Sequence, residues 1–455
     1  MAVRGTIIKE LEDIYSQDGN QIVILYGKQE TNKQSLIKSF LENKKFFYYR
    51  CRQASELEQK RLMGNEISKK YNVRLTKGTY DEYFTRVKSG DPSKLVIVID
   101  EFQYIVKKKN QNFLDSILKL KAKKLYPGPV MVILCCSSVT WIEQEMPETV
   151  DPKFFKKVNK SIKVDDLNFL DMVRVLPKYS VKDSIKVYGI IGGVYDYLDK
   201  WDENKSVKEN VCQLILKKDG YLFDAAERMI SYELRELSVY DTILCAIAAG
   251  HHKLNDLFHV TGYSRAKISV YMKNLSNFDV LEKVVSFQSG GWDNAKKGIY
   301  HIKDTYVNFW FKFIYPHLSD LYLMEPETFY DTYIEPDLDE YLERYFRNVC
   351  MEYLQILDQI GKLPFKVHKM GTWVGKTGNI DIIAQSSNRL NIVGLCNWNK
   401  DYLTLDMYEE LLNTMEKAKL ESDYLYFFSA KSFSKQLIEL SEKDDRIELI
   451  DMNEL

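Results

Sequence analysis

Short apolar runs in the first third of the chain predict the buried strands of a parallel sheet. Strands covered on both faces are apolar at nearly every position, and four segments have this character. One of them ends directly in Asp100 and Glu101, which would place two carboxylates at the carboxyl edge of the sheet. We therefore expect an α/β fold whose chemistry lies at this edge. The four segments are Gln21–Tyr26, Phe46–Cys51, Lys94–Ile99 and Val130–Ser138.

The loop after the first run matches part of a phosphate-binding pattern, G-x-x-x-x-G-K-[ST]. Gly27 and Lys33 fit this pattern, Asn32 stands at its second glycine, and Gln34 replaces its hydroxyl. Asparagine tolerates a left-handed backbone better than other non-glycine residues, so we expect the loop to keep its shape. The hydroxyl normally binds Mg²⁺ directly, and we therefore expect Gln34 to weaken metal binding. Ser35 lies about 100° further round the helix and does not take its place.

Polar residues at the ends of two strands complete the predicted site. Beside such a loop, an acid at the position of Asp100 holds Mg²⁺, and one at the position of Glu101 orients the attacking water. The hydroxyls of Ser137 and Ser138 suit a sensor position between the acids and the γ-phosphate. A helix cap or turn after a core strand explains these two serines equally well.

The composition fits a multi-domain protein of the cytoplasm. A length of 455 residues, 45% of them hydrophobic, is enough for about three packed domains. The N-terminus lacks an apolar signal segment and the apolar runs are strand-sized, so we expect neither export nor a membrane span. Seven cysteines without a C-x-x-C pair favour free thiols in a reducing cytosol over a zinc site. A net charge of -1 limits any contact with nucleic acid to a local basic face.

The segment from Val239 to Lys303 has the order of a winged helix-turn-helix. Its third helix begins after Ser264, and a hairpin around Gly290 and Gly291 would form the wing. Exposed basic residues on such a helix are typical of contact with a major groove, although these modules also dock proteins. The positions expected to face inward are Ile268, Tyr271, Met272 and Leu275. The candidate DNA contacts are Arg265, Lys267 and Lys273 on the helix and Lys296 and Lys297 in the wing.

The last third of the chain predicts a helix followed by a second set of strands. Residues 319–337 contain prolines and aromatic side chains and suit a packed linker, and an amphipathic helix then spans Leu338–Leu357. The order of the following runs suits a restriction-endonuclease-like fold, in which an Asp and an E-x-K on successive strands hold Mg²⁺. Asp381 fits the first position. Leu395-Cys396-Asn397 replaces the E-x-K, and Arg347 stands near the place of a further helix acid, so we interpret Asp381 as the remnant of a nuclease site.

Several short motifs follow one another in a specific order along the chain. They are Ile99-Asp100-Glu101-Phe102, Cys136-Ser137-Ser138, Gly192–Leu198, Tyr300–Asp304 and Phe309-Trp310-Phe311. In this order they resemble a family of prokaryotic ATPases with an archaeal-type P-loop domain, a winged helix and a C-terminal nuclease-like domain of unknown function. The resemblance spans nearly the whole chain and implies an AAA+ or STAND-like site for ATP or ADP with Mg²⁺. Members usually carry an intact loop, so Asn32 and Gln34 mark this chain as a degenerate member.

The resemblance implies four domains and a binding role. The domains are a nucleotide-binding domain (1–165), a helical lid or connector (166–238), a winged helix (239–318) and a nuclease-like domain with an eroded site (337–455). We expect a cytoplasmic protein that binds ATP or ADP weakly, with little or no hydrolysis, and acts on double-stranded DNA, a protein partner or a second copy. Lys33 would contact the β/γ-phosphates and Asp100 the metal. Two alternatives are a slow ATPase in which Glu101 activates water, and an interaction scaffold that needs no nucleotide.

Overall fold

The chain forms two compact units in a computed structural model. The first comprises Met1–Asp166 with Val194–Asp196, and the second comprises Leu167–Gly193 with Tyr197–Leu455. The described residues are 5–75, 78–88, 90, 93–106, 111–287, 298–375 and 378–452. Apart from Asp166 and Val194–Asp196, the second unit holds the residues that we assigned to the last three predicted domains, and this finer division stays a prediction. In the described ranges, every helix is too short or too polar to cross a membrane.

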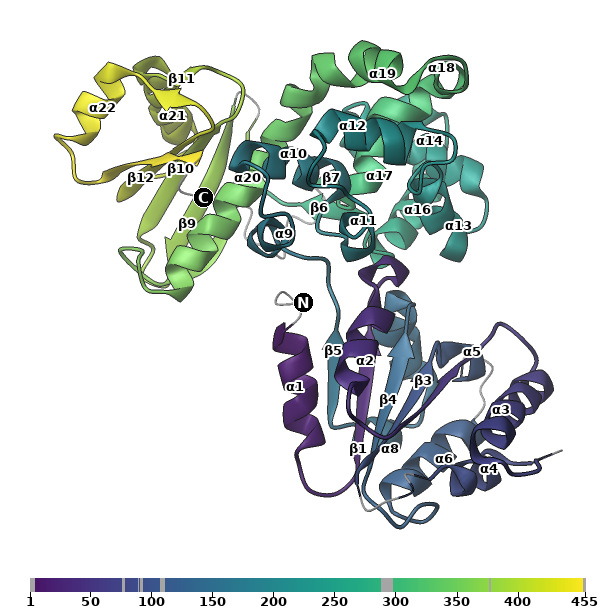
Figure 1. Ribbon diagram of the computed structural model, residues 1–455. Helices are drawn as coiled ribbons and strands as arrows, with labels where there is room; N and C mark the ends of the chain where they lie inside the picture. The colour runs from purple at the N-terminus through teal and green to yellow at the C-terminus, as the bar shows by residue number, and fades with distance from the viewer. Residues whose placement is uncertain are drawn as a thin grey trace. The chain divides into compact units, whose positions relative to one another are not determined.

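The first unit is built on a five-stranded parallel sheet (Figure 1). The strand order is β2-β3-β4-β1-β5, so the strand before the candidate phosphate loop lies between β4 and β5. Parallel neighbours require crossover connections, and helices supply them here. This arrangement confirms the expected α/β fold of the P-loop type. The strands are β1 (Gln21–Tyr26), β2 (Phe46–Arg50), β3 (Leu95–Asp100), β4 (Val130–Cys136) and β5 (Lys160–Lys163).

Helices cover both faces of this sheet, which explains why β3 and β4 are buried at every residue. Alternate strand residues point to opposite faces: Val23 and Leu25 pack with α1 and α2, while Ile22 and Ile24 join the core formed with α3, α4 and α6. The helices are α1 (Gly5–Tyr15), α2 (Lys33–Leu41), α3 (Glu56–Tyr71), α4 (Tyr80–Arg86), α5 (Gln103–Val106), α6 (Gln111–Lys121), α7 (Met146–Thr149) and α8 (Pro152–Phe155).

The second unit begins with helices and a two-stranded antiparallel sheet, β6 (Leu281–Val284) with β7 (Ile299–Ile302). Three helices precede this sheet, in the order that the sequence predicts: α14 (Leu237–Ala248), α15 (Leu254–Thr261) and α16 (Arg265–Asn277). The other helices of this part are α9 (Phe169–Val175), α10 (Val181–Ile191), α11 (Tyr195–Leu198), α12 (Val207–Val211), α13 (Ala225–Glu233), α17 (Thr305–Phe309), α18 (Leu318–Leu323), α19 (Pro326–Phe329) and α20 (Glu335–Gln359).

The segment at residues 319–337, expected as a packed linker, is largely helical, which the sequence did not lead us to expect. Pro326 and Pro336 lie in the first turns of α19 and α20. Proline is tolerated there, since the N–H that it lacks has no partner within the helix. Between them, Tyr330–Ile334 forms a further helical turn and buries Tyr330 and Ile334.

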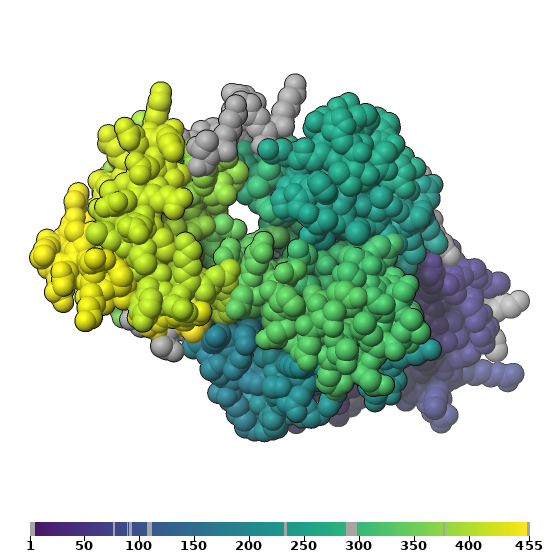
Figure 2. Space-filling model, turned by 90° about the horizontal axis from the view of Figure 1, so that it is seen from above, coloured from purple at the N-terminus to yellow at the C-terminus, as the bar shows by residue number. Residues whose placement is uncertain are grey.

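A second five-stranded sheet forms the C-terminal part of the second unit, with strand order β14-β12-β10-β9-β8. The strands β8, β9 and β10 are antiparallel neighbours, whereas β10, β12 and β14 run parallel, so the sheet is mixed. In the space-filling view this part is a lobe of the second unit, coloured towards yellow (Figure 2). Its elements are β8 (Val367–Val374), β9 (Asn379–Ser386), β10 (Asn391–Asn397), β11 (Tyr402–Leu403), α21 (Leu405–Ala418), β12 (Tyr424–Ser429), β13 (Ser432–Phe433), α22 (Lys435–Ser441) and β14 (Ile447–Asp451).

We predict that Asn20→Ala lowers the free energy of unfolding by about 1–3 kcal/mol, because the Val130 N–H loses this partner and the Leu120 carbonyl keeps only the Lys123 N–H (3.0 Å). The Asn20 amide donates to the Leu120 carbonyl (2.8 Å) and accepts from the Val130 N–H (3.0 Å), joining the end of α6 to the start of β4. Urea denaturation measures the loss. Asn112→Ala, at an exposed position of α6, is the matched control, and an equal loss in both variants would contradict the assigned role.

Candidate phosphate site and the eroded C-terminal site

The candidate phosphate loop connects β1 to α2 and is held closely against the strands beside it. The Gly27 N–H donates to the Cys136 carbonyl (3.2 Å). A Cβ at Gly27 would lie 2.3 Å from the Val164 carbonyl oxygen, so only glycine fits at the start of the loop. The Thr31 hydroxyl donates to the Lys28 carbonyl (2.7 Å) and closes the short turn Gln29–Thr31.

Asn32 shapes the point at which the loop becomes helix. Its backbone is left-handed (φ 50°, ψ 49°), the conformation that the sequence led us to expect. Its side-chain oxygen accepts from the Ser35 N–H (3.1 Å) and so caps α2. The cap uses one of the backbone N–H groups at the helix N-terminus, where P-loop proteins bind phosphate. Ser35 itself is exposed.

The Lys33 side chain lies inside the loop. Its ammonium group donates to the carbonyl oxygens of Gly27 (2.8 Å) and Lys28 (2.7 Å), and the residue is 5% exposed. Burial lowers the pKa of Lys33, and the nearby charge of Glu101 opposes this shift. A P-loop lysine contacts the β/γ-phosphates, and Lys33 occupies that position in the chain.

Asp100 ends β3 and is 4% exposed, with hydrogen bonds to both carboxylate oxygens. Oδ1 accepts from the Glu101 N–H (3.1 Å). Oδ2 accepts from the Tyr48 hydroxyl (2.6 Å) and the Gln34 amide (3.4 Å), and the Arg50 Nε lies 3.8 Å away. Burial, and then the bond to Asp100, raises the pKa of Tyr48, so its hydroxyl stays a donor.

Glu101 also accepts a hydrogen bond from the chain on each of its carboxylate oxygens. Its Oε1 accepts from the Ser137 hydroxyl (2.6 Å), and its Oε2 accepts from the Gln103 amide (2.5 Å). The backbone of Glu101 is left-handed (φ 54°), which is strained for a residue with a long side chain and typical of functional sites. Of the two predicted sensor serines, Ser137 therefore contacts the acid, whereas the Ser138 N–H donates to the Cys136 thiol (3.3 Å).

The structure brings Tyr48, Arg50 and Gln103 into the site, and sequence reasoning missed all three. Tyr48 and Arg50 are two residues apart on β2 and point to one face of the sheet. The pairing of β2 with β3 sets Arg50 opposite Asp100. The available signal was the polar residue at the end of the run Phe46–Cys51, but its meaning depends on which strand lies next to β2.

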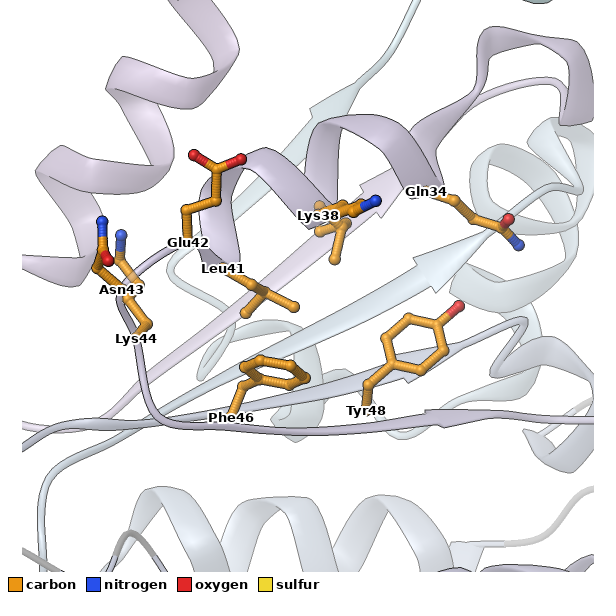
Figure 3. A pocket seen from close by; sticks show the side chains of 9 residues that line it. Gln34, Lys38, Leu41, Glu42, Asn43, Lys44, Phe46 and Tyr48 are labelled. Atoms are coloured by element: carbon orange, nitrogen blue, oxygen red, sulfur yellow. The ribbon is translucent and has the colours of Figure 1, made fainter.

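An apolar groove of about 550 Å³ runs between α2 and β2, beside this network (Figure 3). Leu41 and Phe46 line its middle. The Gln34 amide and the Tyr48 hydroxyl lie together at one end, and both donate to Asp100. Substitution of Gln34 or Tyr48 would therefore change both this end of the groove and the contacts of Asp100.

The candidate DNA contacts lie on the exposed side of α16. The Arg265 guanidinium lies over the Phe258 ring (4.0 Å) and donates to the Asn255 amide oxygen (2.6 Å), and the Lys267 ammonium lies over the Tyr263 ring (4.7 Å). Lys273 is exposed. The predicted wing residues Gly290, Gly291, Lys296 and Lys297 lie outside the described residues.

The predicted cap and apolar face of α16 are confirmed, except for Tyr271. The Ser264 hydroxyl accepts from the Lys267 N–H (3.2 Å). The buried residues of this helix are Ile268, Met272 and Leu275. Tyr271 is half-buried, because its ring packs on Tyr240 while its hydroxyl reaches out to donate to Glu236.

The C-terminal carboxylate that we singled out, Asp381, is paired within the chain itself. Asp381, on β9, accepts from the Arg347 guanidinium (3.1 Å) on one oxygen and from the Cys396 N–H (3.0 Å) on the other. Asn397, at the position of the expected lysine, holds a turn through hydrogen bonds to the backbone of Lys400. The described part of the chain contains no group of three or more His, Cys, Asp or Glu residues placed to hold a metal ion.

Glu343 is a second acid beside Asp381 that sequence reasoning missed. Glu343 lies on α20, four residues and one turn before Arg347. The acid that we expected on this helix near position 347 is therefore present one turn earlier. Burial chiefly raises the pKa of Glu343, and the charge of Asp381 adds to this shift. The Asn399 amide donates to the Glu343 carboxylate and partly offsets it.

Comparison with family models agrees with this architecture. Residues 3–200 match a family described as an ATPase domain predominantly from Archaea. This part of the chain is therefore an archaeal-type ATPase domain. Residues 310–418 match a second family, described as archaeal and bacterial proteins of unknown function. These matches confirm the resemblance drawn from the motifs and show that the first unit is a nucleotide-binding ATPase domain.

Similar proteins include an uncharacterized protein of Methanocaldococcus jannaschii, 26% identical over 387 residues, which cover 84% of this chain and 83% of the relative. Among solved structures, the Walker-type ATPase PABY2304 of Pyrococcus abyssi is 16% identical, with a TM-score of 0.45 over 68% of this chain and 95% of that one. The ORC2 protein of Aeropyrum pernix, solved as ADPNP–ADP complexes, is 10% identical, with a TM-score of 0.47 over 70% of this chain and 94% of that one.

We predict that Asn32→Ala lowers the free energy of unfolding by about 1–2 kcal/mol, because alanine loses the helix cap and is strained in the left-handed conformation. Glycine loses the cap alone, so Asn32→Gly should cost only a few tenths of a kcal/mol, about 0.5 at most. Thermal denaturation of the two variants tests the difference. Equal losses would show that backbone conformation is not what Asn32 contributes.

Proposed function

We propose that this archaeal-type ATPase uses its first unit mainly to bind ATP or ADP, with slow hydrolysis or none. The observation that carries the proposal is a difference between the phosphate loop and the two acids beside it. The loop keeps its glycine, its left-handed turn and a buried lysine, whereas both acids that would manage the metal and the water are bonded to the chain's own donors.

Binding would rest on the loop and on the start of α2. Lys33 would exchange its carbonyl partners for the β/γ-phosphate oxygens, and backbone N–H groups at the helix N-terminus would hold the same phosphates. Gly27 and Asn32 would keep the backbone in position, and the bond from the Ser35 N–H to the Asn32 side chain would hold the start of α2. These contacts do not depend on Glu101, so they remain when hydrolysis is lost.

Hydrolysis would require a water to share Glu101 with donors of the chain. Each carboxylate oxygen of Glu101 already accepts one hydrogen bond, from Ser137 or from Gln103, and this makes it a weaker base toward the water. The hydrogen bond between Ser137 and Glu101 favours one alternative, a slow ATPase. At this position a hydroxyl can stay bonded to the acid and respond when the γ-phosphate leaves. In that alternative Glu101 turns away from Gln103 when nucleotide binds.

The second unit would pass the nucleotide state on by binding DNA or a protein. The support is the exposed basic side of α16, with Arg265, Lys267 and Lys273 on a helix whose apolar side is buried. The C-terminal sheet would serve as a nuclease-like binding module without cleavage, because Arg347 already neutralises Asp381.

We predict that Lys33→Ala weakens ATP binding at least about a hundredfold, since it removes a charged contact to the phosphates worth roughly 3 kcal/mol. Isothermal titration calorimetry of the purified full chain measures the dissociation constant. Lys38→Ala, at an exposed position one turn further along α2, is the matched control and should bind like the wild type. Undetectable ATP binding by the folded wild type would favour a scaffold that needs no nucleotide.

Measurement of ATP hydrolysis distinguishes a protein that only binds nucleotide from a slow ATPase. We expect phosphate release close to background, and Glu101→Gln should leave it unchanged. A clear rate in the wild type that Glu101→Gln lowers about a hundredfold or more would support the slow ATPase instead.

We predict that the double variant Arg265→Glu and Lys267→Glu weakens binding to a short DNA duplex about tenfold or more, because two phosphate contacts become repulsive. A gel shift at low salt measures the change. The matched control reverses two exposed lysines of the C-terminal part, Lys435 and Lys443. An unchanged shift in the α16 variant would favour protein docking by this helix.

A further inference from the structure

Asp100 stands where P-loop ATPases hold Mg²⁺, yet its carboxylate is surrounded by donors that Mg²⁺ cannot use. The ion needs oxygen lone pairs at close range, from carboxylates, hydroxyls, carbonyls or water. Here the Tyr48 hydroxyl donates a hydrogen bond to Oδ2 (2.6 Å), and the positively charged Arg50 guanidinium lies 3.8 Å from the same oxygen. Oδ1 is used by the Glu101 N–H.

Gln34 adds to this mismatch at the position that normally provides a metal-binding hydroxyl. Its amide presents N–H to Asp100 Oδ2, at 3.4 Å. Turning the amide over would set its carbonyl oxygen against the carboxylate, which the negative charge disfavours. The donor set around Asp100 therefore does not fit Mg²⁺.

The same donors supply what the ion would otherwise supply near the phosphates, namely the neutralisation of a buried carboxylate. A buried charge is tolerated only when it is paired and hydrogen-bonded. Arg50 provides the pairing charge, from a position that the register of β2 and β3 sets directly opposite Asp100. Arginine remains charged at any physiological pH, so this neutralisation needs no ion from solution.

We propose that the site binds a nucleoside di- or triphosphate without a divalent cation, with Arg50, Tyr48 and Gln34 together taking the place of Mg²⁺ at Asp100. This inference rests on the proposed nucleotide binding by the first unit. The inference specifies that the ligand is the metal-free nucleotide. It also assigns a positioning role to Arg50, which would act on the bound phosphates through its contact with Asp100.

The test is calorimetric titration of ATP and of ADP into the full chain, once with excess EDTA and once with excess Mg²⁺. For the wild type we expect dissociation constants that agree within about threefold between the two conditions, a difference below 1 kcal/mol. Gln34→Ser with Tyr48→Phe restores a hydroxyl and frees Asp100 Oδ2, so this variant should bind at least about tenfold more tightly with Mg²⁺ than without. Arg50→Gln should weaken binding in EDTA about tenfold, and Arg50→Lys should recover part of that loss.

The outcomes separate this inference from the proposed function. Wild-type binding that strengthens tenfold or more with Mg²⁺ would overturn the inference and leave nucleotide binding in place. Undetectable binding in both conditions would overturn the proposed function as well. Circular dichroism and thermal denaturation of each variant show whether it is folded, and Arg50→Lys keeps the test decisive if Arg50→Gln does not fold.

Discussion

The buried carboxylate of Asp100 sets the conditions for everything else at the edge of the first sheet. A carboxylate that is 4% exposed must be paired, since burial of an unpaired charge costs several kcal/mol or more. Its partners come from β2 and α2 as well as from its own strand, so one charge ties three elements together. The stability of this edge and its chemistry are therefore linked. Any group that enters must compete with contacts on which the fold depends.

Two further acids are also bonded to donors of the chain. Glu101 is bonded by Ser137 and Gln103, and Asp381, on a different sheet, is paired with Arg347. In each case an acid typical of a catalytic site is present, and each of its oxygens accepts a hydrogen bond from the chain. A carboxylate that loses its metal without gaining donors would leave an uncompensated buried charge, so replacement of the metal ligands and addition of a donor belong together.

What could be predicted from the sequence was whatever a local pattern determines. Apolar runs located β1, β3 and β4 because these strands are buried along their length, and Asn32 was expected to be left-handed because few other residues tolerate that backbone. Arg50 was missed because its partner depends on strand register, which no local pattern specifies. The helices around Pro326 and Pro336 were missed because proline was interpreted as a break, although it fits the first turn of a helix.

The contrast between a loop that keeps its glycine and lysine and acids that are bonded to the chain follows from how differently the two halves of the site depend on side chains. Phosphate binding uses backbone N–H groups, one glycine and one lysine, and these survive changes at neighbouring positions. Hydrolysis needs a metal, a base and a water in register, so one occupied acid is enough to stop it. A site that keeps only the first half still transmits information. A ligand at a hundred times its dissociation constant stabilises the state that binds it by about 2.7 kcal/mol, which can shift the balance between two conformations of the chain.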